Sequence, residues 1–249
     1  MAVSVDIEKK LHGFTLKVKL ESDGSPMGIL GASGSGKSMT LRCIAGIQTP
    51  DSGRIVVNDK VLFDSEKKIN LKPQERKVGY LFQNYALFPT MTVEKNIACG
   101  YRGDKKHLKA KVADYIERYQ LNGLEKRYPG QLSGGMAQRV ALVRTLISQP
   151  EILLLDEPLG ALDAFTRMNM QDEILSMWRE HRQLALMVTH DVDEAIYMGT
   201  RVIVMDANPG RIIADIKIEE EFPRDRSSER FIRYRNMILN QLHFAGRNI

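Results

Sequence analysis

The sequence has few cysteines and lacks the signals of membrane insertion or secretion. It contains only 2 cysteines, Cys43 and Cys99, and they do not have the spacing of a metal site. We expect both to be buried, reduced thiols, as in a cytosolic protein. No apolar run approaches the roughly 18 residues that a membrane-spanning helix requires. Residues 1–6 also lack the basic and apolar regions of a secretory signal.

A concentrated block of charge is also missing. The formal net charge is +5, but Lys and Arg are spread along the chain without interleaved aromatic residues. Clustered basic residues are what favour nucleic acid or an anionic membrane. We therefore expect no nucleic-acid partner, and a solvated basic surface on a protein that handles a polyanionic ligand. The 249 residues are enough for a single domain, 1–249, that consists of an α/β core with one insertion.

Residues 31–38 fit the pattern G-x-x-x-x-G-K-[ST], the loop that wraps nucleotide phosphates. Glycines let consecutive backbone N–H groups turn toward an anion, because a Cβ would block that approach. An apolar strand precedes the loop and a helix follows it, so the helix dipole favours bound phosphates. The alternative is a flexible turn that carries a lysine. The predicted nucleotide-binding residues are Gly31, Ala32, Ser33, Gly34, Ser35, Gly36, Lys37 and Ser38.

Apolar patterning divides the rest of the chain into an α/β core and an all-helical insertion. Strands are expected at residues 3–7, 14–20, 27–30, 54–57, 61–63, 78–82, 152–155, 184–189, 202–205 and 211–214. The two expected strands at 54–57 and 61–63 indicate a small antiparallel β layer beside a parallel core. Helices are expected at 39–45, 105–119, between Ser133 and Pro150, around residues 174–178, from Asp191 and at 228–243. We place the core at about 1–84 and 151–249, and the helical subdomain at about 85–150.

Asp191 and Glu194 have the spacing of a capping box at the start of their helix. Two further carboxylates follow the apolar strand at 152–155. Asp156 is placed to hold Mg²⁺, and Glu157 to orient or deprotonate an attacking water. The alternative, that the pair only caps the next turn, is less favoured in a chain that also carries a phosphate loop.

The motif Leu132-Ser133-Gly134-Gly135 predicts a second anion site. Ser133 can cap a helix, while Gly134 and Gly135 leave its first N–H groups uncovered. An ordinary N-cap is the alternative for this motif alone. However, the order of phosphate loop, Gln83, this motif, Asp156-Glu157 and His190 resembles that of the nucleotide-binding subunit of an ATP-binding cassette (ABC) transporter.

The resemblance covers essentially the whole chain and implies a P-loop NTPase (RecA-like) core that binds ATP and Mg²⁺. By this resemblance, Glu157, His190 and Gln83 are catalytic, with His190 contacting the γ-phosphate. The implied Mg²⁺ ligands are Ser38, Gln83 and Asp156. Asp163 would reach across a dimer interface. The family usually stacks an aromatic side chain on adenine, for which Phe14 or His12 are the candidates.

The resemblance also implies partners. Two cassettes would pair head to tail, so that each ATP lies between one phosphate loop and the Ser133–Gly135 segment of the other chain. Two membrane-spanning permease subunits would dock near residues 85–89 and link the chain indirectly to an extracytoplasmic substrate-binding protein. The expected location is therefore the cytoplasmic face of the inner membrane, as a peripheral subunit.

Different parts of the chain resemble the cassettes of two importer groups. Residues 27–101 are similar to molybdate importer cassettes. Residues 159–167, 189–195, 208–212 and 223–226, together with Met136, are similar to sulfonate, taurine and nitrate importer cassettes. The second group is favoured because its match is longer. Non-transport ABC ATPases remain the alternative, although a DNA-maintenance type needs a long coiled coil before Leu132 and a translation-associated type needs a second cassette.

Overall fold

The structure, a computed structural model, describes residues 2–11, 13–160, 162–181, 184–207 and 210–245. Its strands are β1 (Val3–Leu11), β2 (Phe14–Ser22), β3 (Met27–Gly31), β4 (Ser52–Val57), β5 (Lys60–Asp64), β6 (Ile69–Asn70), β7 (Val78–Leu81), β8 (Ile152–Asp156), β9 (Leu184–Thr189), β10 (Arg201–Ala207) and β11 (Gly210–Lys217). They form one 11-stranded sheet in the order β6-β5-β4-β1-β2-β11-β10-β3-β9-β8-β7. The predicted α/β class is confirmed.

The half of the sheet from β10 to β7 is parallel, and its three central strands are completely covered. Every residue of β3, β8 and β9 is buried. Strands that pack helices against both faces need apolar side chains at every position, which is why they are continuous apolar runs in the sequence. The carboxyl ends of these strands meet at one edge, where the candidate site residues lie.

The antiparallel half contains the predicted small β layer, in which β4 pairs with β5. β4 pairs with β1, and β1 with β2, but β2 also pairs in parallel with β11 through Leu16 with Gly210 and Lys17 with Arg211. The layer is therefore continuous with the core. This continuity depends on the β10–β11 hairpin, which brings β11 back beside β2.

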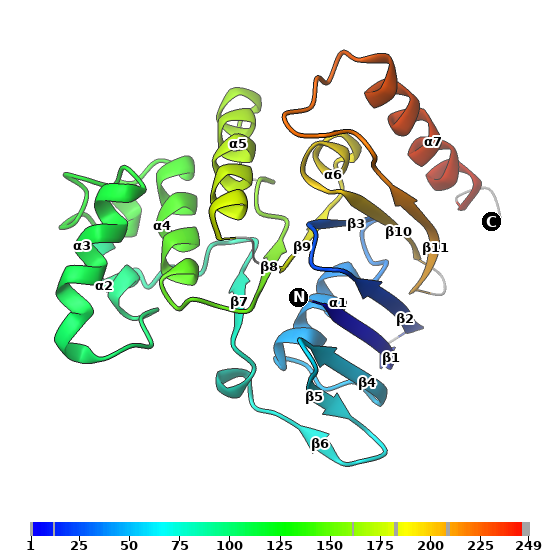
Figure 1. Ribbon diagram of the computed structural model, residues 1–249, viewed down its shortest axis with the longest axis horizontal. Helices are drawn as coiled ribbons and strands as arrows, with labels where there is room; N and C mark the ends of the chain where they lie inside the picture. Colours follow the sequence, from blue (N-terminus) through cyan, green and yellow to red (C-terminus); the bar gives the residue numbers. More distant parts are fainter. Residues whose placement is uncertain (1, 12, 161, 182–183, 208–209, 246–249) are drawn as a thin grey trace.

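The helices are α1 (Lys37–Ala45), α2 (Val93–Ala98), α3 (Leu108–Arg118), α4 (Gly134–Leu146), α5 (Ala164–His181), α6 (Val192–Met198) and α7 (Glu229–Ala245). Short 3₁₀ turns occur at Pro73–Glu75, Lys105–His107 and Pro129–Gln131. In Figure 1, α2, α3 and α4 gather beyond the β7 edge, whereas α7 lies at the opposite end of the molecule, beside α6 and β10. The proposed division of the chain at residues 84 and 151 stays a prediction. None of the helices in the described residues is long and apolar enough to cross a bilayer.

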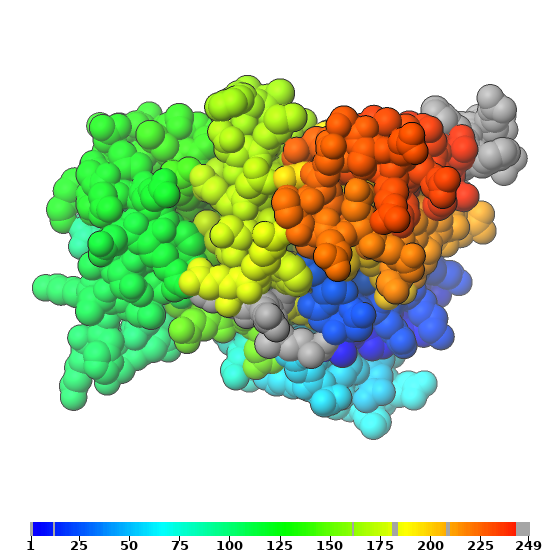
Figure 2. All heavy atoms as spheres, turned by 45° about the horizontal axis from the view of Figure 1, so that its top comes forward, coloured from blue at the N-terminus to red at the C-terminus, as the bar shows by residue number. Residues whose placement is uncertain are grey.

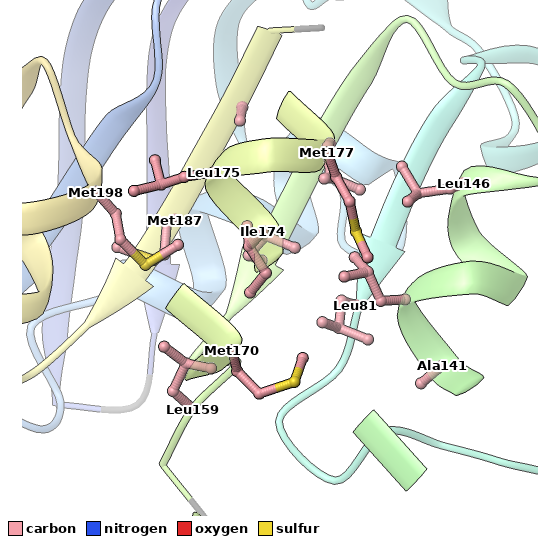
Figure 3. Packing of buried hydrophobic residues seen from close by; sticks show 14 of the residues in the cluster. Leu81, Ala141, Leu146, Leu159, Met170, Ile174, Leu175, Met177, Met187 and Met198 are labelled. Atoms are coloured by element: carbon pink, nitrogen blue, oxygen red, sulfur yellow. The ribbon is translucent and has the colours of Figure 1, made fainter. Parts of the chain in front are cut away.

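Helix α5 joins the helical region to the rest of the molecule. In the space-filling view its atoms lie between those of α3 and α4 on one side and the C-terminal segment on the other (Figure 2). Figure 3 shows Met177 of α5 in the space that faces Leu146 of α4, while Leu175 turns toward Met198 of α6. Flexible thioethers fill the irregular space between these elements.

Two local expectations are wrong. Asp191 caps α6, but Glu194 does not return to the Asp191 N–H; that N–H donates to Thr189 Oγ1 at 3.0 Å, and Thr189 Oγ1 donates to Glu194 Oε2. The threonine hydroxyl thus replaces the predicted capping box. Cys43 is buried as expected, but Cys99 is exposed, because it ends the short helix α2 instead of lying inside one.

Candidate functional site

The loop between β3 and α1 can exist only with glycine at several positions. Gly34 and Gly36 have φ of +84° and +92°, in the left-handed region. A Cβ on Gly36 would lie 2.5 Å from Cδ1 of Leu16, and one on Gly31 would lie 2.5 Å from the carbonyl oxygen of Met205. The chain is therefore held in a tight loop at the N-terminus of α1, which is a geometry suited to anions.

Lys37 lies inside this loop. Only 5% of it is exposed, and its Nζ donates to the carbonyl oxygens of Gly31 at 2.8 Å and Ala32 at 2.9 Å. Burial lowers the pKa of Lys37, while the charges of Glu157 and Asp156 act in the opposite direction. The hydroxyl of Ser35 is also buried, without a hydrogen-bond partner among the described residues. Both side chains are available to an anion that enters the loop.

Asp156 is held from two sides. Ser38 Oγ donates to Asp156 Oδ1 at 2.6 Å, and the Tyr80 hydroxyl donates to Asp156 Oδ2 at 2.7 Å. Burial raises the pKa of Tyr80, so its hydroxyl remains a donor. The described residues contain no cluster of three or more His, Cys, Asp or Glu that could hold a metal. A serine hydroxyl beside one carboxylate nevertheless fits Mg²⁺, which takes one or two protein oxygens and completes its shell with water and phosphate.

Glu157 meets two other candidate residues at the ends of adjacent strands. Its Oε2 is 3.2 Å from Nε2 of Gln83, which follows β7, and 3.3 Å from Nδ1 of His190, which follows β9. The Glu157 side chain is 19% exposed and the His190 side chain 60%. The backbone of Glu157 has φ of +47°, and its N–H donates to the carbonyl of Val188. Such a left-handed non-glycine residue is a feature often seen at functional sites.

Ser133, Gly134 and Gly135 lie at the start of α4. Ser133 Oγ accepts from the Met136 N–H at 3.3 Å, as the sequence predicted for an N-cap. A Cβ on Gly135 would lie 2.9 Å from Cγ2 of Thr166, so α4 begins against the first turn of α5. None of the hydrogen bonds recorded for the described residues joins this segment to the phosphate loop. No hydrogen bond therefore links the two predicted anion-binding segments within the described part of the chain.

Asp163 precedes α5. Its carboxylate accepts from the Thr166 N–H at 3.0 Å, and this backbone hydrogen bond is the main reason that the pKa of Asp163 is lowered. Asp163 therefore fixes the start of α5 and stays charged. Among the residues expected near adenine, His12 lies outside the described residues. Phe14 is half-buried, and a Cβ on Gly210 would come within 2.9 Å of its ring and 3.0 Å of the Ser35 carbonyl oxygen, which places this ring beside the phosphate loop.

Three side chains around the site, one tyrosine and two arginines, were not singled out by sequence reasoning. Tyr80 reaches Asp156, as described above. Arg144 of α4 donates to the carbonyl oxygens of Tyr85 and Ala86, and Arg167 of α5 contacts Asp191. A hydroxyl within the apolar strand 78–81 was a signal for Tyr80. The two arginines gave none, because surface arginines are common on helices.

A glycine loop around a buried lysine, a hydroxyl–carboxylate pair and a Gln–Glu–His cluster at the strand ends together define a P-loop ATPase. The chain matches the ABC transporter family over residues 13–160. It belongs to that family, and within it is an ATP-binding cassette. The fold and recognition predictions are therefore confirmed.

Curated relatives cover most of the chain. An aliphatic sulfonates import ATP-binding protein, SsuB, of Bacillus cereus is 42% identical over 218 residues, which are 88% of this chain and 83% of that protein. The SsuB of Bacillus licheniformis is 40% identical over 249 residues, covering 97% of this chain and 94% of the relative. An uncharacterized ABC transporter ATP-binding protein of Methanocaldococcus jannaschii is 44% identical over 86% of this chain and 78% of its own length.

Solved cassettes share the fold. A dimeric post-hydrolysis ATP-binding cassette bound to ADP and Pi matches with a TM-score of 0.73 and 26% identity, over 89% of this chain and all (100%) of that one. CbiO1 of Clostridium perfringens, described as part of the ABC transporter complex cbiONQ, matches with a TM-score of 0.76 and 26% identity, over 98% and 97% of the two chains. These likenesses extend over the core and the helical region alike.

Proposed function

We propose that this chain is the ATP-hydrolysing subunit of an importer for aliphatic sulfonates or a related small oxyanion. The observation that carries the proposal is the position of Glu157, whose carboxylate lies between Gln83 and His190 at the strand ends. The SsuB relatives, about 40% identical over most of the chain, support sulfonates as the substrate class. Taurine and nitrate belong to the same expected group, and molybdate is the next candidate.

The nucleotide would be held by the phosphate loop. The backbone of residues 31–36 offers its N–H groups to the phosphates, and Lys37 exchanges its bonds to Gly31 and Ala32 for bonds to the β- and γ-phosphates. Ser38, Asp156 and Gln83 would hold Mg²⁺, which neutralises charge on the phosphates when it is bound. Phe14 is the candidate that stacks on adenine.

Hydrolysis requires a water molecule in line with the γ-phosphate. The Glu157 carboxylate accepts a hydrogen bond or proton from that water, and its left-handed backbone and the bond to Val188 fix the direction of the side chain. His190 would contact the γ-phosphate, and its Nδ1, 3.3 Å from Glu157 Oε2, holds Glu157 from the other side. Gln83 completes the cluster from β7 and leads into the helical region.

One chain provides only part of an ATP site. Ser133, Gly134 and Gly135 form no hydrogen bond with the phosphate loop among the described residues, which supports a role for them toward a second cassette. A head-to-tail homodimer places this segment and Asp163 opposite the partner's γ-phosphate. The dimeric state of the solved cassette that shares the fold supports this arrangement. Closure on two triphosphates would be driven by charge-assisted hydrogen bonds of roughly 1.5–3 kcal/mol each.

Two permease subunits would dock near residues 85–89. Phe88 is 48% exposed there, and its ring lies 5.7 Å from the Arg144 guanidinium. An extracytoplasmic binding protein would deliver the substrate to these permease subunits. The cassette itself would remain peripheral, on the cytoplasmic face of the membrane. The solved CbiO1, part of a transporter complex, supports such an assembly.

The variant Glu157→Gln tests the proposal. Glutamine keeps the shape of the side chain but cannot accept the proton, so the variant should bind Mg²⁺-ATP and remain a closed dimer. The mass of the ATP-bound chain, measured by light scattering, should double while ATPase activity is lost. Adding Lys37→Ala as a control should return the chain to the monomer. A Glu157→Gln variant that hydrolyses ATP at the parental rate would exclude Glu157 as the base.

A further inference from the structure

Arg167 joins the segment that carries Asp163 to the loop that carries His190. From the first turn of α5, its Nη2 donates to the carbonyl oxygen of Leu162 at 3.1 Å, and its Nη1 contacts Asp191 Oδ2 at 3.3 Å. Leu162 directly precedes Asp163, and Asp191 directly follows His190. The guanidinium therefore touches the immediate neighbours of both residues.

The loop that carries His190 is fixed at both of its ends. On one side, Thr189 Oγ1 accepts from the Asp191 N–H and donates to the buried carboxyl of Glu194. On the other side, Asp191 Oδ1 accepts from the N–H groups of Asp193 and Glu194. The His190 side chain itself is 60% exposed, so its position depends on this backbone and on its contact with Glu157. Because His190 and Asp191 are consecutive residues, a displacement of Asp191 also displaces His190.

We propose that Arg167 is a positioning residue that transmits contacts made at Asp163 by a second copy of this chain to His190. The relay rests on the proposed head-to-tail dimer. When the partner engages Asp163, the adjoining Leu162 carbonyl is fixed, and Arg167 transfers this constraint to Asp191. Each cassette thus senses closure at Asp163 and orients its own histidine in response.

The chemistry of arginine suits this role. Its planar guanidinium offers several N–H donors in a fixed arrangement, so one side chain can hold a carbonyl and a carboxylate together. The Arg167 side chain is 33% exposed, but its Nε is buried and has no partner among the described residues. Because this N–H donor is unused, the guanidinium can exchange one hydrogen-bond partner for another when the segment around Asp163 moves. Lysine, a single ammonium, can reach only one of the two partners well.

Arg201 provides a matched control. Its side chain is also 33% exposed, and it likewise joins a carboxylate to a carbonyl, with Nε donating to Asp215 and Nη1 to Glu21, each at 2.6 Å. It connects β10 to β11 and β2, away from the candidate site. Arg201→Gln should thus report the structural cost of losing such a bridge without affecting His190.

Hydrogen–deuterium exchange in the Glu157→Gln background tests the relay. Addition of Mg²⁺-ATP to this chain should slow exchange in the phosphate-loop peptide and in the peptide that covers residues 189–194. With Arg167→Gln added, the phosphate loop should remain protected while protection of residues 189–194 is lost. Arg167→Lys should restore part of it, and Arg201→Gln should keep both. Circular dichroism melting checks that the two glutamine variants are folded.

The outcomes separate the relay from the proposed function. A Glu157→Gln chain that stays monomeric with ATP overturns the dimer and the relay with it. A dimer in which Arg167→Gln keeps full protection of residues 189–194 overturns the relay alone. In the active chain, Arg167→Gln should lower kcat about 10- to 100-fold with an unchanged KM for ATP, as expected for a misplaced catalytic group. An equal loss in Arg201→Gln would show a merely structural effect.

Discussion

The Tyr80 hydroxyl donates a hydrogen bond to Asp156 Oδ2, across the boundary between two neighbouring parallel strands, β7 and β8. Ser38 Oγ donates to the other carboxylate oxygen, Oδ1, so Tyr80 and Ser38 together orient the Asp156 carboxylate. A carboxylate that is held in this way is ready to bind a cation without reorganising. Tyr80 therefore contributes to the site through Asp156.

Replacement of Tyr80 by Phe should raise the Mg²⁺ concentration that ATPase activity requires. The change leaves a buried carboxylate oxygen without its donor, which costs about 1–3 kcal/mol of unfolding free energy. The Mg²⁺ concentration for half-maximal ATPase activity should rise several-fold, whereas KM for ATP at saturating Mg²⁺ should change little. Tyr197→Phe is the matched control, because the Tyr197 hydroxyl likewise donates to a carboxylate, that of Asp172, outside the site. The same Mg²⁺ dependence in both variants would contradict a role for Tyr80.

Replacement of Glu194 by Gln should flatten the pH dependence of stability. Burial, reinforced by Asp191 and Glu157, raises the pKa of Glu194 to about 7, against the opposing effects of Thr189 and Arg167. Because the folded chain holds this proton more tightly than the unfolded one, the stabilisation is complete below about pH 4.5 and is lost as pH rises through about 7. Each unit of pKa difference corresponds to about 1.4 kcal/mol.

Urea unfolding at a series of pH values between about 4.5 and 8 measures this effect. The free energy of unfolding should decrease more steeply with pH in the parental chain than in Glu194→Gln. The exposed Glu117 serves as control, since Glu117→Gln should leave the parental slope intact. Parallel profiles for the parental chain and Glu194→Gln would show that Glu194 titrates normally.

Replacement of Phe88 by Asp should separate ATP binding from transport. Phe88 is 48% exposed, so a carboxylate there costs little stability but opposes an apolar docking contact. Permease subunits should no longer co-purify, and sulfonate uptake by the assembled transporter should be lost, with ATP affinity as in the parental chain. Ile232→Asp on α7 is the control, because Ile232 is 41% exposed at the other end of the molecule (Figure 1). Unchanged co-purification of Phe88→Asp would place the docking surface elsewhere.

Replacement of Arg144 by Ala should release the turn that follows Gln83. Tyr85 and Ala86 have φ of +61° and +44°, and Arg144 donates to both of their carbonyl oxygens at 2.7 Å. Without it, stimulation of ATPase activity by the permease subunits should fall, because the turn connects Gln83 to the proposed docking surface. Arg139→Ala, on the same helix but paired with Glu173, should keep the stimulation. Equal stimulation in both variants would argue against this connection.

Much of the parallel half could be predicted from the sequence, because strands covered on both faces are apolar throughout. The runs at 152–155 and 184–189 are examples, and the positions of Asp156 and His190 follow from where these runs end. Helix α2 could not be predicted, because six residues are too few to show a helical period. The continuity of the sheet also could not be predicted, since it depends on only two residue pairs between β2 and β11.

The contacts of buried charged side chains also could not be predicted from the sequence. Arg76 is only 1% exposed and donates to the carbonyl oxygens of Cys43 and Ile44 at the end of α1. Arg224, 4% exposed, does the same at the end of α6, where it donates to Gly199 at 2.6 Å. Helix C-termini leave carbonyl groups that a cation can satisfy. Which arginine reaches which helix is decided by tertiary packing, and the same is true of Arg144 and Arg167 around the site.

The place of β3 in the sheet has a consequence for how the protein is made. The strand that leads into the phosphate loop pairs only with β9 and β10 among the described residues, and these strands lie more than 150 positions later in the chain. At the usual 5–20 residues per second, a ribosome needs about 10–35 s to reach the end of β10 after finishing β3. Until β9 is made, β3 is an apolar segment with two unpaired edges, and one of these edges stays unpaired until β10 follows. The nascent chain thus carries the strand that leads into the phosphate loop without its partners through most of its synthesis, and molecular chaperones would protect it from mispairing during that time.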